Sequence, residues 1–300
     1  MSKLVIVGTV ALDSIQTPIE SGDEILGGSA VYSCLGASLF TKVCISAVIG
    51  KDFPAPHSEL LRKAGIDTTG LEKASGKTFR WEGRYDEKLG DPETLSVHLN
   101  VFENFRPNLP DKLRNAEFVF LANMDPVTQM ETLKQIKSPR VVACDTMNFW
   151  IENSLSDLKK TLKMVNILII NNSEALSLSG ENSVVAAART IKKMGPETVV
   201  IKRGEFGCIM FSGKEVFCSP AYPVERAVDP TGAGDTFAGG FMGYLSENGA
   251  DRYEHLKQAV IHGSVLASFT VEKLGTESIK KLNRKKFEDR LGKFVEMLRF

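Results

Sequence analysis

Short apolar runs bounded by turn residues recur along the chain. They lie at residues 3–8, 43–50, 118–123, 141–146, 165–171 and 198–204. Continuous apolar runs of this length suit strands that are buried on both faces. Stretches with helical spacing lie between most of them, for example at residues 155–164 and 184–194. This alternation predicts an α/β fold, a three-layer arrangement in which helices flank a mostly parallel sheet.

One region has a different period. Residues 94–101, TLSVHLNV, alternate strictly between apolar and polar side chains. A period of two predicts a half-exposed antiparallel strand, and residues 77–85 would be its partner. We therefore expect a small β-sheet formed mainly by residues 77–103, with an edge extension of the main sheet as the alternative. Such a sheet would act as a lid over a cleft or meet a second subunit.

The segment 229–245, DPTGAGDTFAGGFMGYL, combines many glycines with helical spacing. Phe237, Phe241 and Tyr244 recur at i, i+4 and i+7, which places them on one face of a helix. A glycine inside a helix costs roughly 1 kcal/mol against alanine. We therefore expect the glycines within this helix to permit close packing against a neighbour.

The start of this predicted helix is a candidate anion site. Gly232, Ala233 and Gly234 would expose several backbone N–H groups to one point, where the helix dipole adds positive potential. Asp235 falls in the first turn, where a carboxylate either complements the dipole or accepts a proton from an attacking hydroxyl. Together these features favour phosphoryl transfer, which depends on positioning and charge stabilisation.

Composition limits the other possibilities. The 300 residues are 43% hydrophobic and 25% charged, which is ordinary for a well-cored protein. Lys plus Arg equals Asp plus Glu at 37 each, so we expect neither nucleic acid nor a membrane surface as a partner. The longest apolar runs fall short of the roughly 20 residues of a membrane span. The N-terminus lacks a signal-peptide layout, and we expect a cytoplasmic protein.

Common nucleotide loops are missing from the sequence. The first apolar run is followed by GTVALD, which lacks GxGxxG, and no GxxxxGK[ST] occurs in the chain. The five cysteines include no CxxC pair, so we expect no metal or disulfide role for them. GAGD at residues 232–235 therefore remains the main candidate for phosphate chemistry.

The segment DPTGAGDTFAGGF closely resembles the C-terminal signature of the ribokinase-like, or PfkB, family of sugar and nucleoside kinases. Further matches follow in the family's order: Asp13 after the first strand, LGGSA at 26–30, NNSE at 171–174 and KRGEFG at 202–207. The resemblance covers nearly the whole chain. It implies a single ribokinase-like kinase domain over residues 1–300, with the small sheet as its lid.

The resemblance implies an ATP-dependent phosphotransferase that phosphorylates a hydroxyl of a small sugar, with Mg²⁺ as a cofactor. Asp235 matches the family's catalytic base, and Gly232, Ala233 and Gly234 match its anion hole. The alternatives are an adenosine or other nucleoside kinase and a catalytically silent sugar-binding protein. Intact GAGD and NxxE motifs argue against the silent protein.

Further residues match the nucleotide and cation side of the family's site. Asn171 and Glu174 match the NxxE motif, which positions magnesium and phosphate largely through water. The other expected nucleotide-site residues are Lys202, Gly204, Gly207, Thr231, Ser264 and Gly275. Potassium activates many members through the loop that corresponds to Asp229 and Thr231, and the sequence leaves open whether this chain needs K⁺. Lid sheets of relatives often pair, so a homodimer through the lid is a further expectation.

Substrate contacts are expected at one set of residues: Asp13, Gly27, Gly28, Ser29, Tyr32 and Asn148. Two positions depart from the family's pattern. Tyr32 stands where an asparagine often contacts a sugar, and Trp150 stands where arginine is common. The aromatic rings of Tyr32, Trp81 and Trp150 would either stack on a sugar or base or belong to the core.

Overall fold

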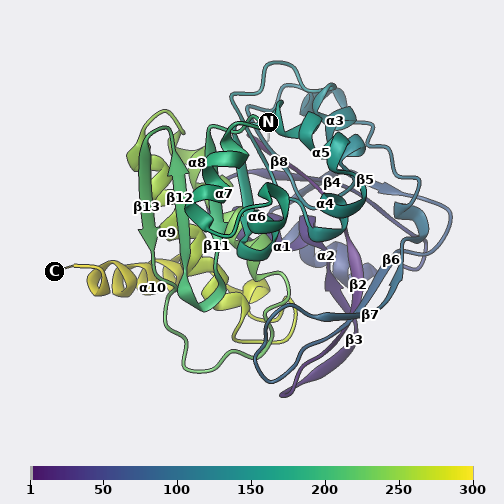
Figure 1. Ribbon diagram of the computed structural model, residues 1–300. Coiled ribbons are helices and arrows are strands. Elements are labelled where there is room, and N and C mark those ends of the chain that lie inside the picture. Colours follow the sequence, from purple (N-terminus) through teal and green to yellow (C-terminus); the bar gives the residue numbers. More distant parts are fainter. Residues whose placement is uncertain (1–2, 300) are drawn as a thin grey trace.

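The structure, a computed structural model, describes residues 3–299. Its larger sheet consists of β1 (Leu4–Val7), β4 (Val43–Ile49), β5 (Asp67–Lys73), β8 (Phe118–Leu121), β9 (Val141–Cys144), β10 (Ile167–Asn171), β11 (Thr198–Lys202), β12 (Cys208–Ser212) and β13 (Glu215–Ser219). These nine strands follow the order β13-β12-β11-β10-β9-β8-β1-β4-β5 (Figure 1). Within residues 3–299, the pairings β11–β12 and β12–β13 are antiparallel and the other pairings of this sheet are parallel, so the predicted mostly parallel sheet is confirmed.

Each of the six predicted apolar runs contains one strand of this sheet. The first strand shows why the runs are continuous. Leu4 and Ile6 of β1 enter the apolar cluster on one face of the sheet, whereas Val5 and Val7 enter the cluster on the other face. All four side chains are buried, because helices cover both faces.

The helices form two outer layers. One face is covered by α1 (Ser29–Ala37), α2 (Ala55–Lys63), α8 (Ala233–Asn248) and α9 (Tyr253–Thr270). The other is covered by α3 (Pro126–Leu133), α4 (Asn148–Asn153), α5 (Leu155–Leu162), α6 (Asn172–Ser179) and α7 (Val184–Lys192). α10 (Arg284–Met297) packs on the outside of α9. The three-layer prediction is therefore confirmed, including the two helices expected at 155–164 and 184–194.

The glycines inside α8 allow two helices to approach it closely. A Cβ on Gly239 would lie 2.1 Å from the carbonyl oxygen of Ser33 in α1. A Cβ on Gly240 would lie 2.5 Å from Leu266 of α9. Since real Cβ atoms do not come this close to a backbone carbonyl, Gly239 is required by the packing. The prediction of a closely packed glycine face is confirmed.

The lid is a separate four-stranded sheet made of β2 (Ala11–Gln16), β3 (Ser21–Gly27), β6 (Phe79–Arg84) and β7 (Glu93–His98). The strand order is β3-β2-β6-β7, and the sheet lies to one side of the main layers (Figure 1). The antiparallel pair β6–β7 falls within the expected residues 77–103. β2 and β3 were not predicted, because their residues do not alternate in polarity. The lid is therefore formed by two hairpins rather than mainly by residues 77–103.

The last lid strand is shorter than its alternating pattern suggested. β7 ends at His98, and Asn100 takes a left-handed φ of 51° at the start of a 3₁₀ turn. Leu99 and Val101 therefore lie outside the strand. Val97 is 48% exposed and Leu99 is 41% exposed, which leaves apolar surface on the lid.

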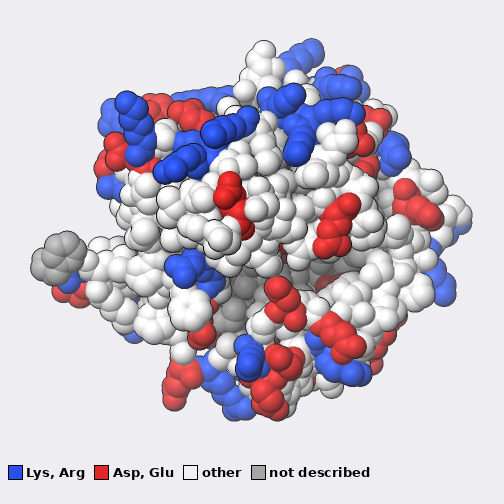
Figure 2. Space-filling model, in the orientation of Figure 1, with Lys and Arg blue, Asp and Glu red and all other residues white. Residues whose placement is uncertain are grey.

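Lys and Arg side chains gather over α3 and α5 in the view of Figure 2, whereas charges of both signs mix over the lid. Lys159 and Lys160 lie in the last turn of α5, and Arg189 and Lys192 lie in the last turn of α7. Cations at these positions complement the negative ends of the helix dipoles. Among the described residues, no helix is both long enough and apolar enough to cross a membrane.

Candidate active site

The start of α8 is free of capping side chains. Gly232 is the N-cap residue and has a left-handed φ of 72°, and no side chain within residues 3–299 caps this helix start. A Cβ on Gly232 would lie 2.4 Å from the ring of Tyr32, and a Cβ on Gly234 would lie 2.8 Å from Nζ of Lys202. The backbone N–H of Ala233 donates to the Pro230 carbonyl at 3.1 Å. The uncapped start of the helix faces an ammonium group, and together they form a positive site for an anion.

Asp235 lies in the first turn of α8, next to this positive site. The pKa of its carboxyl group is raised to about 7, chiefly by burial and also by the Asp145 carboxylate, while the Lys202 ammonium acts to lower it. The backbone carbonyl of Asp235 accepts a hydrogen bond from Ser33 Oγ at 3.0 Å, which ties the first turn of α8 to α1. A carboxyl group that titrates near neutral pH is suited to general-base catalysis.

Lys202, at the end of β11, lies among three carboxyl groups. Its Nζ is 3.6 Å from Oδ2 of Asp145, and both side chains are largely buried. Burial alone would lower the pKa of Lys202, but the carboxylates of Asp145, Glu174 and Asp235 raise it above its ordinary value. The ammonium is therefore held in its charged form beside the end of β9 and the starts of α6 and α8.

The NxxE motif forms a capping box at the start of α6. Asn171 Oδ1 accepts a hydrogen bond from the backbone N–H of Glu174 at 2.8 Å, and Glu174 Oε2 accepts one from the backbone N–H of Asn171 at 2.7 Å. Burial raises the pKa of Glu174 to about 8, the Asp145 carboxylate adds to the rise, and Lys202 opposes it. Local capping therefore explains why these two residues occur at this spacing.

The structure places Asp13 inside β2 of the lid sheet, not beyond the end of a parallel strand of the main sheet as the sequence suggested. The difference arises because the chain leaves the main sheet after β1 and enters the lid at once. Asp13 is 4% exposed, and a Cβ on Gly27 would lie 1.8 Å from its Oδ2. Gly27 is therefore glycine because the carboxyl group of Asp13 lies directly against it.

Asp13 is also electrostatically linked to the start of α8. Burial raises the pKa of its carboxyl group to about 8; the carboxylates of Asp229 and Asp235 add to this rise, and the backbone N–H of Gly28 lowers it by hydrogen bonding. Gly28 is the N-cap residue of α1 and has a φ of 98°. The structure thus brings together the acceptor-side carboxyl predicted at Asp13 and the base predicted at Asp235.

Asn123, which sequence reasoning missed, joins Ser29 at the start of α1 to Trp150 in α4. Its backbone carbonyl accepts a hydrogen bond from Ser29 Oγ at 3.4 Å, and its Oδ1 accepts one from Trp150 Nε1 at 3.0 Å. Its Nδ2 donates to Met147 Sδ at 3.1 Å. A polar residue ends the predicted run 118–123, and that position at the carboxyl end of a parallel strand was a usable signal.

Two predicted substrate residues carry buried polar atoms without a hydrogen-bond partner in the described part of the chain. These atoms are the Tyr32 hydroxyl oxygen and Asn148 Oδ1. Tyr32 is 1% exposed, and its ring lies over Gly232. Asn148 is the first residue of α4. Since a buried polar atom without a partner is costly, each is available to a ligand or an ordered water.

Asp229 connects two loops beside α8. Its Oδ1 accepts a hydrogen bond from the backbone N–H of Thr231 at 2.8 Å, and its Oδ2 accepts one from the backbone N–H of Gly275 at 2.7 Å. Asp229 is fully buried, and burial raises the pKa of its carboxyl group. Gly275 has a φ of 56°, as a glycine in a tight turn can.

The other predicted nucleotide-side residues lie around the β11–β12 hairpin. Gly204 and Gly207 occupy the turn after Lys202, and a Cβ on Gly207 would lie 2.0 Å from the carbonyl oxygen of Ser219. Ser264 is 8% exposed in α9.

The arrangement of carboxyl groups fits a magnesium ion held mainly through water and phosphate. Within residues 3–299, no three His, Cys, Asp or Glu side chains converge as a direct metal cage. Asp145 and Glu174 nevertheless supply the oxygen donors that Mg²⁺ prefers, and Mg²⁺ commonly keeps several waters and binds through one or two carboxylates and substrate phosphates.

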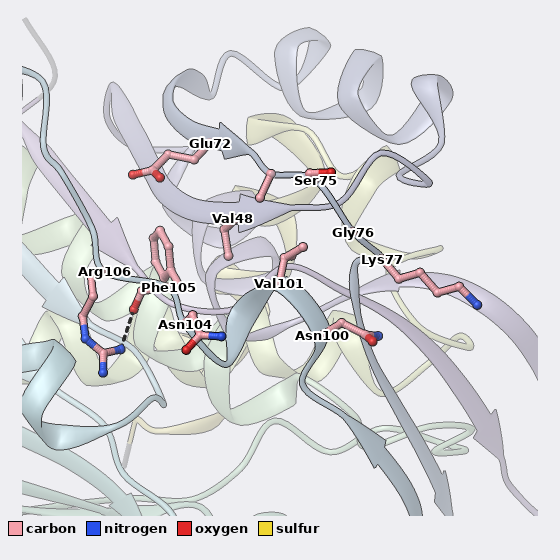
Figure 3. A pocket seen from close by; sticks show the side chains of 11 residues that line it. Val48, Glu72, Ser75, Gly76, Lys77, Asn100, Val101, Asn104, Phe105 and Arg106 are labelled. Carbon is pink, nitrogen blue, oxygen red and sulfur yellow. Dashed lines mark hydrogen bonds between the residues drawn. The ribbon is translucent and has the colours of Figure 1, made fainter.

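A cavity of 490 Å³ lies elsewhere, where β5 and the return from β7 meet (Figure 3). Its lining includes Glu72, Lys77, Asn100 and Arg106, none of which belongs to the predicted site. Arg106 is engaged with the carbonyl of Phe105 at 2.9 Å, and Glu72 accepts a hydrogen bond from the backbone of Asn108 at 3.3 Å. This cavity is therefore separate from the candidate active site.

Comparisons with known proteins agree with the fold and the motifs. Residues 2–282 match the family model described as pfkB family carbohydrate kinase. A cytidine kinase from Thermococcus kodakarensis is 30% identical, with 93% of this chain and 99% of the relative covered. A ribokinase from Staphylococcus aureus is 28% identical, with 92% and 96% covered.

Among solved structures, the nucleoside kinase of Methanocaldococcus jannaschii has the same fold, with a TM-score of 0.78 at 20% identity and coverage of 97% of this chain and 98% of that one. The predicted family and its sugar or nucleoside acceptor are thus confirmed. The chain belongs to the PfkB family of carbohydrate kinases and is an ATP-dependent phosphotransferase that acts on a sugar or a nucleoside.

Proposed function

We propose that this kinase transfers the γ-phosphoryl group of ATP to a ribose hydroxymethyl group of a nucleoside, with Asp235 as the general base. The observation that carries the proposal is the start of α8. A carboxyl group with a pKa of about 7 lies in the first turn of a helix whose start, among the described residues, has no capping side chain and faces Lys202. Positive potential and a proton acceptor thus meet at one point, as in-line phosphoryl transfer requires.

In the proposed reaction, Asp235 takes the proton of the acceptor hydroxyl as its oxygen attacks the γ-phosphorus. The bond between this phosphorus and the β–γ bridging oxygen breaks, and ADP leaves with the bond's electron pair. The N–H groups of Gly232 and Gly234, together with Lys202, stabilise the charge on the transferred group. The N–H of Ala233 would join them by exchanging its hydrogen bond to the Pro230 carbonyl for one to the phosphoryl group. Asp13 would orient the acceptor, because its carboxyl group lies against Gly27 and interacts electrostatically with the carboxylate of Asp235.

Asn171 and Glu174 would hold Mg²⁺ through water, and the buried Asp145 would add negative charge beside it. When bound, the ion neutralises charge on the nucleotide phosphates. Lys202, Gly204 and Gly207 would lie along those phosphates, with Ser264 and Gly275 near the nucleotide. The capping box keeps Asn171 and Glu174 in fixed positions for this role.

A nucleoside acceptor is favoured over a free sugar by the surface around Asn123. Met147 is 39% exposed and Phe149 is 52% exposed, although both are large and apolar. The rings of Phe149 and Trp150 pack edge to face with their centroids 4.8 Å apart, and Trp150 Nε1 donates a hydrogen bond to Asn123. An exposed aromatic surface of this kind suits a nucleobase, and the T. kodakarensis relative is a cytidine kinase.

A substrate panel tests this choice. ADP release is measured with purine and pyrimidine nucleosides, pentoses, hexoses and sugar acids at equal concentration. We expect the highest kcat/KM with a nucleoside, and Phe149→Ala should raise its KM while barely affecting any free sugar. Faster turnover of a free sugar than of every nucleoside would contradict the assignment and restore the small sugar that the sequence favoured.

Three further properties are part of the proposal. The loops joined by Asp229 would bind K⁺, so exchange of K⁺ for tetramethylammonium should lower the rate.

The exposed Val97 and Leu99 of the lid would form a homodimer contact, which light scattering of Val97→Asp would test. The enzyme would act in the cytoplasm, where ATP is available.

A further inference from the structure

Tyr85 belongs to the lid, but its side chain points away from solvent. It follows β6 directly, and its backbone N–H donates to the carbonyl of Gln16 at 2.8 Å, which extends the lid pairing by one residue. Its neighbours Arg84 and Asp86 are exposed, whereas Tyr85 is only 7% exposed. The ring is therefore held between the lid and the main body of the protein.

The Tyr85 hydroxyl contacts the loop that leads into α8. Its oxygen accepts a hydrogen bond from Thr231 Oγ1 at 2.9 Å, across 146 positions in the sequence. Thr231 directly precedes Gly232, and its own N–H is fixed by Asp229 at 2.8 Å. Any displacement of Tyr85 is thus transmitted to the residue next to the bare helix start.

A second contact links the same hairpin to the start of α6. Asp91 lies in the loop between β6 and β7, and its Oδ2 is 3.5 Å from Ser173 Oγ. Ser173 in turn donates to Asn171 Oδ1 at 2.9 Å. The β6–β7 hairpin therefore reaches past the acceptor side and contacts both helix starts on the phosphate side.

We propose that Tyr85 is a positioning residue: through its hydrogen bond to Thr231, closure of the lid over the acceptor fixes the α8 start that receives the phosphoryl group. The proposal rests on the proposed role of α8. It explains why a lid residue has a buried hydroxyl that is hydrogen-bonded to Thr231, in the loop that leads into α8. A shift of a fraction of an ångström at that loop would misalign the N–H groups, and small misplacements of reacting groups are costly in rate.

Limited proteolysis measures the lid directly. Lys88 is exposed in the β6–β7 loop, so trypsin cleavage after it reports how firmly the hairpin is held. With the acceptor identified by the panel and a non-hydrolysable ATP analogue, we expect cleavage of the wild type to slow by about fivefold relative to the free enzyme. Tyr85→Phe should lose most of this protection. Tyr253→Phe, at the start of α9, is the matched control and should keep it.

Kinetics supply the second measurement. Tyr85→Phe and Thr231→Val should each lower kcat by about tenfold and raise acceptor-independent ATP hydrolysis relative to transfer. The double variant should be no worse than either single variant, because both remove one hydrogen bond. Thr231→Ser keeps the hydroxyl that bonds Tyr85 and should keep the lid protection that Thr231→Val loses.

Two results would overturn the proposal: wild-type protection and kcat in Tyr85→Phe, or additive losses in the double variant. If Tyr85→Phe does not fold, the pair Thr231→Val and Thr231→Ser decides the same question. Failure of the proposed acceptor appears differently, as absence of nucleoside turnover in the wild type.

Discussion

The two helices that begin beside Lys202 have opposite starts. α6 begins with a complete capping box, in which the side chains of Asn171 and Glu174 each accept a backbone N–H. α8 begins at Gly232, with no capping side chain in the described part of the chain. In α6 a side chain accepts the first-turn N–H of Glu174. In α8 the N–H of Ala233 is accepted by the Pro230 carbonyl, and the rest of the helix start has no capping side chain and is open to a ligand.

This difference separates two tasks at one site. A capped start is rigid and stable by itself, so α6 can hold the carboxyl group of Glu174 in place for an ion. A bare start is less stable alone but is a ready anion site, and α8 compensates by packing tightly between α1 and α9. The contrast supports the proposed division, in which α8 would receive the phosphoryl group and α6 would support the metal.

Replacement of Asp235 should have the largest effect. In Asp235→Asn, the acceptor hydroxyl loses its base, and we expect kcat to fall by about 10³-fold. Nucleotide affinity by calorimetry and the melting temperature should stay near or above the wild-type values, since a buried carboxyl group is replaced by a neutral amide. Near-normal turnover would show that Asp235 is not the base.

A methyl group at the bare start of α8 should have the next largest effect. In Gly232→Ala, the Cβ would lie 2.4 Å from the Tyr32 ring, in a left-handed conformation that favours glycine. We expect kcat to fall by about 10²-fold, as when a donor of an anion hole is lost. Gly213→Ala is a matched control, because Gly213 has a φ of 55° and open space around it. Equal kinetic losses in both variants would contradict the special role of this start.

Glu174→Gln should have the smallest effect on turnover. Glutamine also closes a capping box, so α6 should remain intact. We expect the Mg²⁺ concentration for half-maximal rate to rise about tenfold, the lower end of the losses seen for residues around metal ligands, with the acceptor KM unchanged. An unchanged Mg²⁺ dependence would remove Glu174 from the metal site.

The same variant has a pH signature in stability. The folded Glu174 has a pKa of about 8 against 4.5 ordinarily, chiefly because it is buried. The folded state therefore binds this proton more tightly, and its contribution to stability is lost as pH rises from about 4.5 to about 8. Glu174→Gln avoids this loss, so its advantage in melting temperature should grow over that range.

Sequence reasoning found most of what is local in this site. GAGD was recognised because a helix start is defined by a few consecutive residues, and NNSE was recognised through the resemblance to the family. The six buried strands were recognised for the same reason, since each is one apolar run between turns. Tyr32 was singled out by its departure from the family pattern, and its ring lies over Gly232.

What the sequence did not predict depends on contacts between distant segments. β2 and β3 lack polarity alternation, because β2 is buried along most of its length whereas β3 is exposed or half-buried until its last two residues. Asp13 was therefore expected beyond a strand of the main sheet but lies in the lid. Asn123 and Tyr85 gain their importance only through Trp150 and Thr231, which lie 27 and 146 positions away.

The pH dependence of the single-turnover rate tests the central claim most directly. With Asp235 as the base and a pKa of about 7, the wild-type rate should fall about tenfold per pH unit well below pH 7. The slow residual rate of Asp235→Asn should be flat over the same range. An identical pH-dependent fall in Asp235→Asn would show that another group accepts the proton and would contradict the account.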